Sequence, residues 1–273
     1  MQSEIHVPTV LRAVRRAGDL FLSEYKQTPI PPNRADLMTR LQTIDDRCLA
    51  SLRADLTPAF ADTPWLIGDE FDSAGQRQPL DWPQYWLCDA MDGAIQYLQH
   101  LPGWSINLVL IRDGHPYLSV IYAPLEGELF WAREGAGAFL NDVPIKPSTK
   151  TDPSVMLAAF DYGHPDEADP TPELNRQIGQ SVTALLDQFG IVRNYGPHGI
   201  QLASVGAGRI DLFHQQGLDT FNWLAGLLIA REAGADILTT DGRPWTWGEN
   251  SLLVAAPGVA GPFLKATANA QAV

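Results

Sequence analysis

The first third of the chain has an apolar pattern that predicts two helices. Apolar residues recur at intervals of three or four positions, at Val10, Val14, Ala17 and Phe21. This spacing is typical of a helix with one buried stripe. After a proline-rich segment at 29–32, a second stripe contains Leu37, Leu41, Ile44, Cys48 and Leu52. Because Cys48 lies on that stripe, we interpret it as a small core residue and not as a nucleophile.

From Trp86 onward the pattern changes to short runs that predict strands. Three β-rich runs at 105–112, 117–122 and 128–133 are separated by turns that contain glycine, which favours an antiparallel meander. Farther along, strand and helix patterns alternate, as is typical of an α/β layer. Strands are expected at 155–160, 191–194, 210–213, 235–238 and 252–256. Helices are expected at 173–188, 200–207 and 222–233, with a C-terminal piece from 258.

The charge of the chain narrows the classes of partner. It has 19 Lys and Arg against 32 Asp and Glu, which gives a formal net charge of −13. Binding to nucleic acid or to an anionic membrane rests on clustered basic residues, so we expect neither partner. We expect a cytoplasmic protein, because the chain shows no basic and apolar leader and no apolar run of about 18 residues. Its 2 Cys exclude a disulfide scaffold and a thiolate zinc site.

Carboxylates gather at three points where a strand or helix is expected to begin or end. Asp69 and Glu70 follow one apolar run, Asp89 and Asp92 follow another, and Asp219 precedes an apolar helix pattern. Taken alone, each cluster has a simpler explanation as a strand end, a turn or a helix cap. Taken together, they offer the oxygen ligands that Mg²⁺ prefers, near a helix start suited to a phosphate. We therefore predict a Mg²⁺-dependent phosphate site.

The combination of motifs resembles the inositol monophosphatase family of Mg²⁺-dependent, lithium-sensitive phosphatases over nearly the whole chain. The segment 67–70 (IGDE) is similar to the Gly-Glu-Glu segment of that family, and 86–94 (WLCDAMDGA) is similar to its Trp-x-x-Asp-Pro-x-Asp-Gly-Thr motif. Residues 120–124, 128–132 and 135–141 resemble the central meander of the family. Segments 43–46, 208–211 and 225–234 resemble its second helix and its C-terminal pattern.

The resemblance implies an α/β (α+β) fold, a layered αβαβα sandwich of the inositol monophosphatase and sugar phosphatase type, and a homodimer. It leads us to expect one compact unit in two parts. Residues 1–150 would hold the N-terminal helices, the meander and most metal ligands. Residues 151–273 would form an α/β subdomain that closes the site.

The resemblance also assigns roles to single residues. Asp69 would bind a metal and orient the attacking water, Asp89 would bridge two metals, and the carbonyl of Met91 would be a further ligand. Asp92 would hold the second metal. The resemblance implies Mg²⁺ at one to three positions. The expected substrate is a small phosphorylated metabolite, held in part by Gly93.

Several positions depart from the family pattern at the expected chemistry. The family threonine whose hydroxyl helps to activate water is Ala94 here, so the relay through Asp46 is cut. The third acidic ligand of the second metal is Asn222 here, a neutral residue, so that metal should bind more weakly. Asp219 lies near enough in sequence to replace the ligand if the backbone turns it inward.

The expected substrate pocket departs from the family pattern as well. The family segment of small residues reads Gly196, Pro197 and His198 here, and a family glutamate that contacts substrate is Gln215. A single histidine is often only a packing residue, but His198 lies where a ligand contact is expected.

Two classes of function follow from these residues. In the first, the protein is a phosphoric monoester hydrolase that acts on a small sugar or polyol phosphate through metal-activated water, with weakened activity. In the second, it is a catalytically impaired family member with a binding or regulatory role. General-base assistance is typically worth about 10²–10⁴ in rate, so the loss of the hydroxyl at Ala94, together with the loss of the acid at Asn222, predicts slow or absent turnover.

Overall fold

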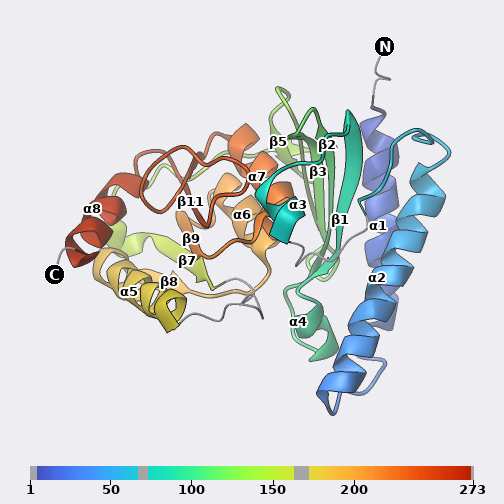
Figure 1. Cartoon of the computed structure of the whole chain (residues 1–273), viewed down its shortest axis with the longest axis horizontal. Helices are drawn as coiled ribbons and strands as arrows, with labels where there is room; N and C mark the ends of the chain where they lie inside the picture. The colour runs from blue at the N-terminus through green and yellow to red at the C-terminus, as the bar shows by residue number, and fades with distance from the viewer. Residues whose placement is uncertain (1–4, 67–72, 163–171, 272–273) are drawn as a thin grey trace.

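The structure is a computed structural model that describes residues 5–66, 73–162 and 172–271 (Figure 1). Its outermost layer on one side consists of the long helices α1 (Val7–Glu24) and α2 (Arg34–Leu56). The two predicted stripes face inward, and Val14 and Leu52 are fully buried. Cys48 is also fully buried, so its interpretation as a core residue is confirmed. The side chain of Asn33 caps α2 by accepting a hydrogen bond from the backbone N–H of Asp36.

The next layer is a six-stranded antiparallel sheet, here called sheet A, whose strands follow one another in sequence order. They are β1 (Gln84–Asp92), β2 (Ser105–Arg112), β3 (His115–Ala123), β4 (Glu128–Arg133), β5 (Ala138–Leu140) and β6 (Val143–Pro144). The predicted meander is confirmed, and β1, β5 and β6 extend it. β2 is apolar on both faces because Leu108 packs toward α1 and α2 while Val109 packs toward the helix on the other side.

Two helices, α6 (His198–Gly206) and α7 (Thr220–Ala233), form the middle layer. α7 is apolar around most of its circumference because sheet A lies on one side and a second sheet on the other. Leu228 packs in the cluster with sheet A, and Leu227 packs in the cluster with the second sheet. The two helices approach closely at Gly226, where an added Cβ would lie 2.5 Å from the Cβ of Leu202.

The second sheet, sheet B, and two outer helices complete the fold. Its strand order is β10 (Asp236–Leu238), β11 (Ser251–Ala255), β9 (Leu212–Gln216), β7 (Leu157–Asp161) and β8 (Ile191–Arg193). β7 runs parallel to β8 and to β9, whereas the remaining pairs are antiparallel. The helices α5 (Pro172–Gln188) and α8 (Ala260–Gln271) cover its outer face (Figure 1).

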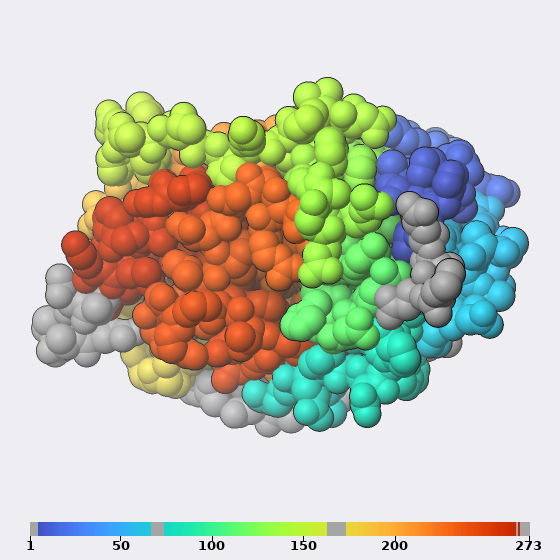
Figure 2. Space-filling view, turned by 90° about the horizontal axis from the view of Figure 1, so that it is seen from above, coloured from blue at the N-terminus to red at the C-terminus, as the bar shows by residue number. Residues whose placement is uncertain are grey.

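The expected αβαβα sandwich is therefore confirmed. Figure 2 shows the N-terminal helices and the C-terminal segments at opposite ends of the molecule, with strands of sheet A between them. Three short elements complete the chain: α3 (Ser73–Arg77) before β1, α4 (Ala94–Leu98) between β1 and β2, and the 3₁₀ turn η1 (Pro153–Val155) before β7. No helix within the described ranges combines the length and the apolar composition that a membrane crossing requires.

Some predicted boundaries are wrong where the site lies. The strand expected at 210–213 is β9, which begins at Leu212 and runs to Gln216, so it carries Gln215. The helix expected at 200–207 begins at His198, directly after Pro197. In the apolar run before Asp69, Trp65 makes an isolated bridge to Trp86, and the run continues beyond the described residues at 67.

The buried His214 in sheet B generates a stability prediction. Burial lowers the pKa of His214 from 6.5 to about 4, and its ring packs edge-on against Phe263. Below pH 6.5 the unfolded chain takes up a proton that the folded chain does not, so stability is lost as the pH falls toward 4. The shift corresponds to about 3 kcal/mol. We expect the free energy of unfolding, measured in urea, to fall less between pH 7 and pH 4 in His214→Leu than in wild type.

The matched control for this prediction is His115→Leu, because His115 is exposed at the start of β3. That variant should keep the pH dependence of wild type. Equal losses of stability in wild type and His214→Leu over this pH range would show that His214 does not cause the effect.

Candidate functional site

A β-bulge at the end of β1 brings the two predicted acidic ligands to one face of sheet A. Asp89 pairs with Asn107 of β2, but Asp92 pairs with Ser105, so β1 holds one more residue than β2 between these pairs. In a regular strand, residues three apart point to opposite faces. The extra residue restores Asp89 and Asp92 to the same face, which is turned toward α6 and α7.

Two glycines that are expected to contact substrate lie next to this bulge. Gly93 has φ +85° and Gly196 has φ +95°, values in the left-handed region that favours glycine. A Cβ at Gly93 would lie 2.7 Å from Cγ of Pro197, and one at Gly196 would lie 2.0 Å from Nε2 of Gln96. Ala94 begins α4 directly after the first turn. The structure thus brings together the expected substrate residues around the start of α6.

The carboxylate of Asp92 receives three hydrogen bonds. The backbone N–H groups of His198 and Gly199, at the start of α6, donate to Oδ1 at 3.2 Å and to Oδ2 at 2.7 Å. Asn107 donates its side-chain amide to Oδ2 at 3.0 Å, and Ser105 donates its hydroxyl to Asn107 Oδ1 at 2.8 Å. Asp92 is therefore the cap that fixes the N-terminus of α6 to sheet A.

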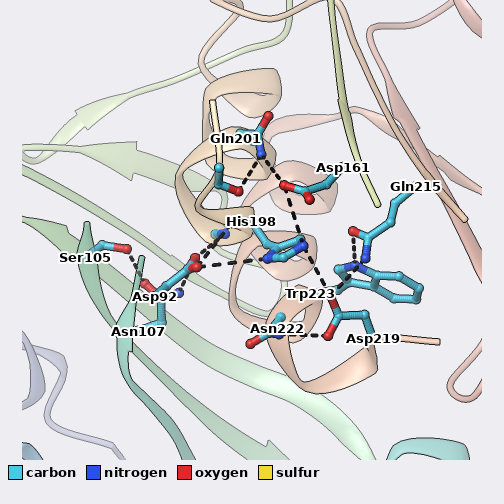
Figure 3. A network of polar contacts seen from close by, with 12 residues as sticks. Asp92, Ser105, Asn107, Asp161, His198, Gln201, Gln215, Asp219, Asn222 and Trp223 are labelled. Atoms are coloured by element: carbon cyan, nitrogen blue, oxygen red, sulfur yellow. Dashed lines mark hydrogen bonds and ion pairs between the residues drawn. The ribbon is translucent and has the colours of Figure 1, made fainter. Parts of the chain in front are cut away.

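The side chain of His198 points into a group of three buried carboxylates (Figure 3). Its Nε2 lies 3.2 Å from Oδ2 of Asp219 and 3.8 Å from Oδ2 of Asp161. Its Nδ1 lies 4.0 Å from Oδ1 of Asp92. The three acids come from β1, the end of β7 and the residue before α7. The expected ligand contact at His198 is occupied here by the acids of the protein itself.

Polar side chains from α6, β9 and α7 surround two of these acids. Gln201 donates to Oδ2 of Asp161 at 3.2 Å, and the N–H of Tyr162 donates to Oδ1 at 2.8 Å. Asp219 accepts from the amide of Gln215 at 2.9 Å and from the amide of Asn222 at 2.7 Å. Gln215 also accepts a hydrogen bond of 2.7 Å from the indole of Trp223. Both ends of the Gln215 amide are thus used inside the protein.

Burial makes the charges of this network costly. It raises the pKa of Asp92, against which His198 and the N–H donors act to lower it. Burial also raises the pKa of Asp161, and the charge of Asp219 adds to this effect, while His198 opposes it. His198 is thus a stabilising partner of both carboxylates.

Other expected site residues do not join the network. Asp46 is exposed on α2, where its Oδ1 accepts a hydrogen bond from Gln42. Its neighbour Asp45 has its pKa raised to about 6, first by desolvation and then by the charge of Asp46. Asp69 lies outside the described residues, so its predicted role stays a prediction.

The sequence prediction missed Asn107, Asp161 and Gln201. Asp161 closes the predicted strand at 155–160, so it carried the same signal of an acid after an apolar run that singled out Asp89. Asn107 and Gln201 lie inside an apolar strand and helix and gave no such signal. Asp219 was considered as a replacement ligand, and the structure turns its side chain inward at 3% exposure.

A cavity of about 440 Å³ adjoins the network. It shares Pro197 and Gln201 with the site, and its lining also includes Tyr195 and Ile200. A volume of this order suits a small molecule.

Comparison with known proteins identifies the family. The profile described as the inositol monophosphatase family matches residues 8–272. The chain belongs to this family. It is 27% identical over 212 residues to an inositol-1-monophosphatase of Caulobacter vibrioides, covering 76% of this chain and 77% of the relative. It is also 27% identical over 243 residues to the Nus factor SuhB of Escherichia coli K12, covering 89% of this chain and 86% of the relative.

Solved structures of the family have the same fold. An inositol monophosphatase from Anabaena (Nostoc) sp. PCC 7120 superposes with a TM-score of 0.77 at 23% identity, over 96% of this chain and 94% of the other. The extragenic suppressor protein suhB from Bartonella henselae superposes with a TM-score of 0.77 at 20% identity, over 96% and 98%. The family includes phosphomonoesterases and generally depends on Mg²⁺.

The residues at the expected second Mg²⁺ position do not fit a bound ion. Mg²⁺ needs oxygens at about 2.0–2.1 Å in a near-octahedral arrangement. Both oxygens of Asp92 accept protein N–H groups, and the amide nitrogen of Asn222 donates to Asp219. Across residues 5–66, 73–162 and 172–271, no three acidic, His or Cys side chains are arranged to hold a metal ion.

The Asp92 cap generates a second stability prediction. A Cβ at Gly199 would lie 2.5 Å from Nδ2 of Asn107 and 3.1 Å from Oδ2 of Asp92. Gly199→Ala must therefore separate Asn107 from the carboxylate and leave buried polar groups without partners. We expect the free energy of unfolding, measured in urea, to fall by about 1–3 kcal/mol.

Gly179→Ala on the exposed side of α5 is the matched control, since nothing lies within 4 Å of an added Cβ there. Alanine is the better helix former, so this control should be neutral or stabilising. If the two variants had the same stability, the close packing around Asp92 would not contribute to folding.

Proposed function

We propose that the protein binds a small sugar or polyol phosphate and hydrolyses its phosphomonoester slowly in the presence of Mg²⁺. The observation that carries the proposal is the bulged end of β1, which keeps Asp89 and Asp92 on the face of sheet A that meets α6 and α7. Family membership supports the reaction class. The neighbouring cavity supports a substrate of small size.

We expect slow turnover because the residues near the bulge lack a group that could activate the attacking water. Asp89, the carbonyl of Met91 and Asp69 are the residues proposed to hold Mg²⁺, which when bound polarises a phosphoryl oxygen and lowers the pKa of water. Ala94 has no hydroxyl to hold that water. Asp46, the next member of the expected relay, accepts a hydrogen bond from Gln42. Without a general base the reaction loses a factor of about 10²–10⁴.

One observation favours a second candidate function, a binding or regulatory role without turnover. Gln215, Asn222 and His198, three of the proposed substrate contacts, are all engaged with buried acids. Relatives named Nus factor SuhB show that names other than phosphatase occur in this family. With such relatives, the expectation of no nucleic-acid partner, drawn from the net charge, stays a prediction.

We propose that the two parts of the chain, residues 1–150 and 151–273, form the site together. Residues 1–150 hold the bulge and residues 151–273 supply α6 and α7, which close over it. We also propose a homodimer in the cytoplasm, by analogy with the family.

Phosphate release tests the proposed function. We expect slow release with Mg²⁺ from at least one member of a panel of inositol monophosphates, fructose 1,6-bisphosphate and adenosine bisphosphate. Chelation with EDTA should abolish it. If a correctly folded protein released no phosphate from any of them, the hydrolase proposal would be wrong and the binding role would be favoured.

Restoring the hydroxyl at position 94 tests the explanation of slow turnover. Ala94→Thr should raise kcat while leaving KM nearly unchanged, by at most the factor of about 10²–10⁴ that general-base assistance supplies. The control is Ala50→Thr, the same change at an exposed position of α2. An unchanged kcat in Ala94→Thr would mean that the missing hydroxyl does not limit the rate.

A further inference from the structure

The imidazole of His198 lies at the point where three carboxylates from separate parts of the chain converge. Its two ring nitrogens lie within 3.2–4.0 Å of oxygens of Asp92, Asp161 and Asp219. These three acids are 6%, 7% and 3% exposed, and His198 is 6% exposed. A buried group of acids is costly unless a cation or hydrogen-bond donors compensate it. Here the group that lies between the three acids is the side chain of His198.

The remaining contacts of the three acids are also made by the protein. Asp92 accepts the N–H groups of His198 and Gly199 and the amide of Asn107. Asp161 and Asp219 accept hydrogen bonds from the side-chain amides of Gln201, Gln215 and Asn222 (Figure 3). Asp161 also accepts a hydrogen bond from the backbone N–H of Tyr162. Each carboxylate therefore has both a donor from the surrounding chain and the imidazole as a neighbour.

A divalent ion and this imidazole exclude one another. An ion that used these carboxylates would need their oxygens at about 2.0–2.1 Å, which requires them to close around the space that the ring now fills. Asn222 also disfavours an ion at Asp219, since its amide nitrogen donates a hydrogen bond to that carboxylate at 2.7 Å. The side chain at 222 thus supplies a hydrogen-bond donor to the acid instead of a charged ligand to an ion.

We propose that His198 takes the place of a cation among Asp92, Asp161 and Asp219, so that the second Mg²⁺ position of the proposed site is closed in this chain. The inference rests on the proposed function in that both concern one acidic site. It also makes a separate claim about the number of divalent ions that each chain binds, and this claim does not depend on whether the protein hydrolyses a substrate. Removal of the ring should let the three carboxylates shift toward the vacated space, where a divalent ion would replace both the imidazole and the N–H donors whose hydrogen bonds Asp92 now accepts.

Counting bound Mn²⁺ tests this inference. We expect His198→Ala to bind one more Mn²⁺ per chain than wild type, measured by calorimetric titration and by electron paramagnetic resonance of the free ion. The double variant His198→Ala with Asp161→Asn should weaken the added ion by about tenfold or more, because even outer partners of a metal contribute that much. Asp161→Asn in the wild-type background should leave the Mn²⁺ number unchanged.

His115→Ala is the matched control, since that histidine is exposed on β3 and its loss should not change the Mn²⁺ number. Circular dichroism establishes that each variant is folded. An equal Mn²⁺ number in folded His198→Ala and wild type would overturn the proposal. So would loss of an ion from the wild-type protein on Asp161→Asn.

A second measurement does not depend on the stability of the variant. Crystals of the wild-type protein grown with Mn²⁺ should show no anomalous peak within coordination distance of Asp161 or Asp219, with the imidazole between them. A peak there would contradict the proposal. If phosphate release fails while the Mn²⁺ number rises in His198→Ala, the proposed hydrolysis is wrong and the inference stands.

Discussion

The geometry of the site depends on the capping of α6 by Asp92. One carboxylate at the end of β1 accepts two backbone N–H groups of the helix and the amide of Asn107, so sheet A and the middle helix layer meet at a fixed point. The N-terminus of a helix carries unpaired N–H groups and partial positive charge, which an acid satisfies well. The position of His198, the first residue of α6, follows from this cap.

The layered packing makes that fixed point rigid. α6 and α7 lie between two sheets, and their small residues let them approach closely, as Gly226 does against Leu202. A buried helix of this kind has little freedom to rotate, because close-packed interiors resist changes of volume. Asp219 and Asn222 at the start of α7 are therefore held at a set distance from His198 at the start of α6.

The sequence predicted the fold better than the site. Periodicity located most helices and strands, and β2 matches its expected range of 105–112, because each such element buries one or two complete faces. The presence of Asp89 and Asp92 on the same face of sheet A could not be predicted from the alternation of strand residues, since it depends on a bulge. The role of His198 depends on contacts with Asp161 and Asp219, which are far apart in sequence, and no local pattern encodes such a meeting.

The departures at positions 198 and 222 are chemically consistent with each other. A site that binds an ion benefits from an acid at 222, whereas a site closed by an imidazole gains more from a neutral amide that donates a hydrogen bond to Asp219. A fourth carboxylate beside Asp219 would add like charge to an interior that already raises the pKa of Asp161. Asn222 and His198 together thus replace an interaction with an external ion by interactions within the chain.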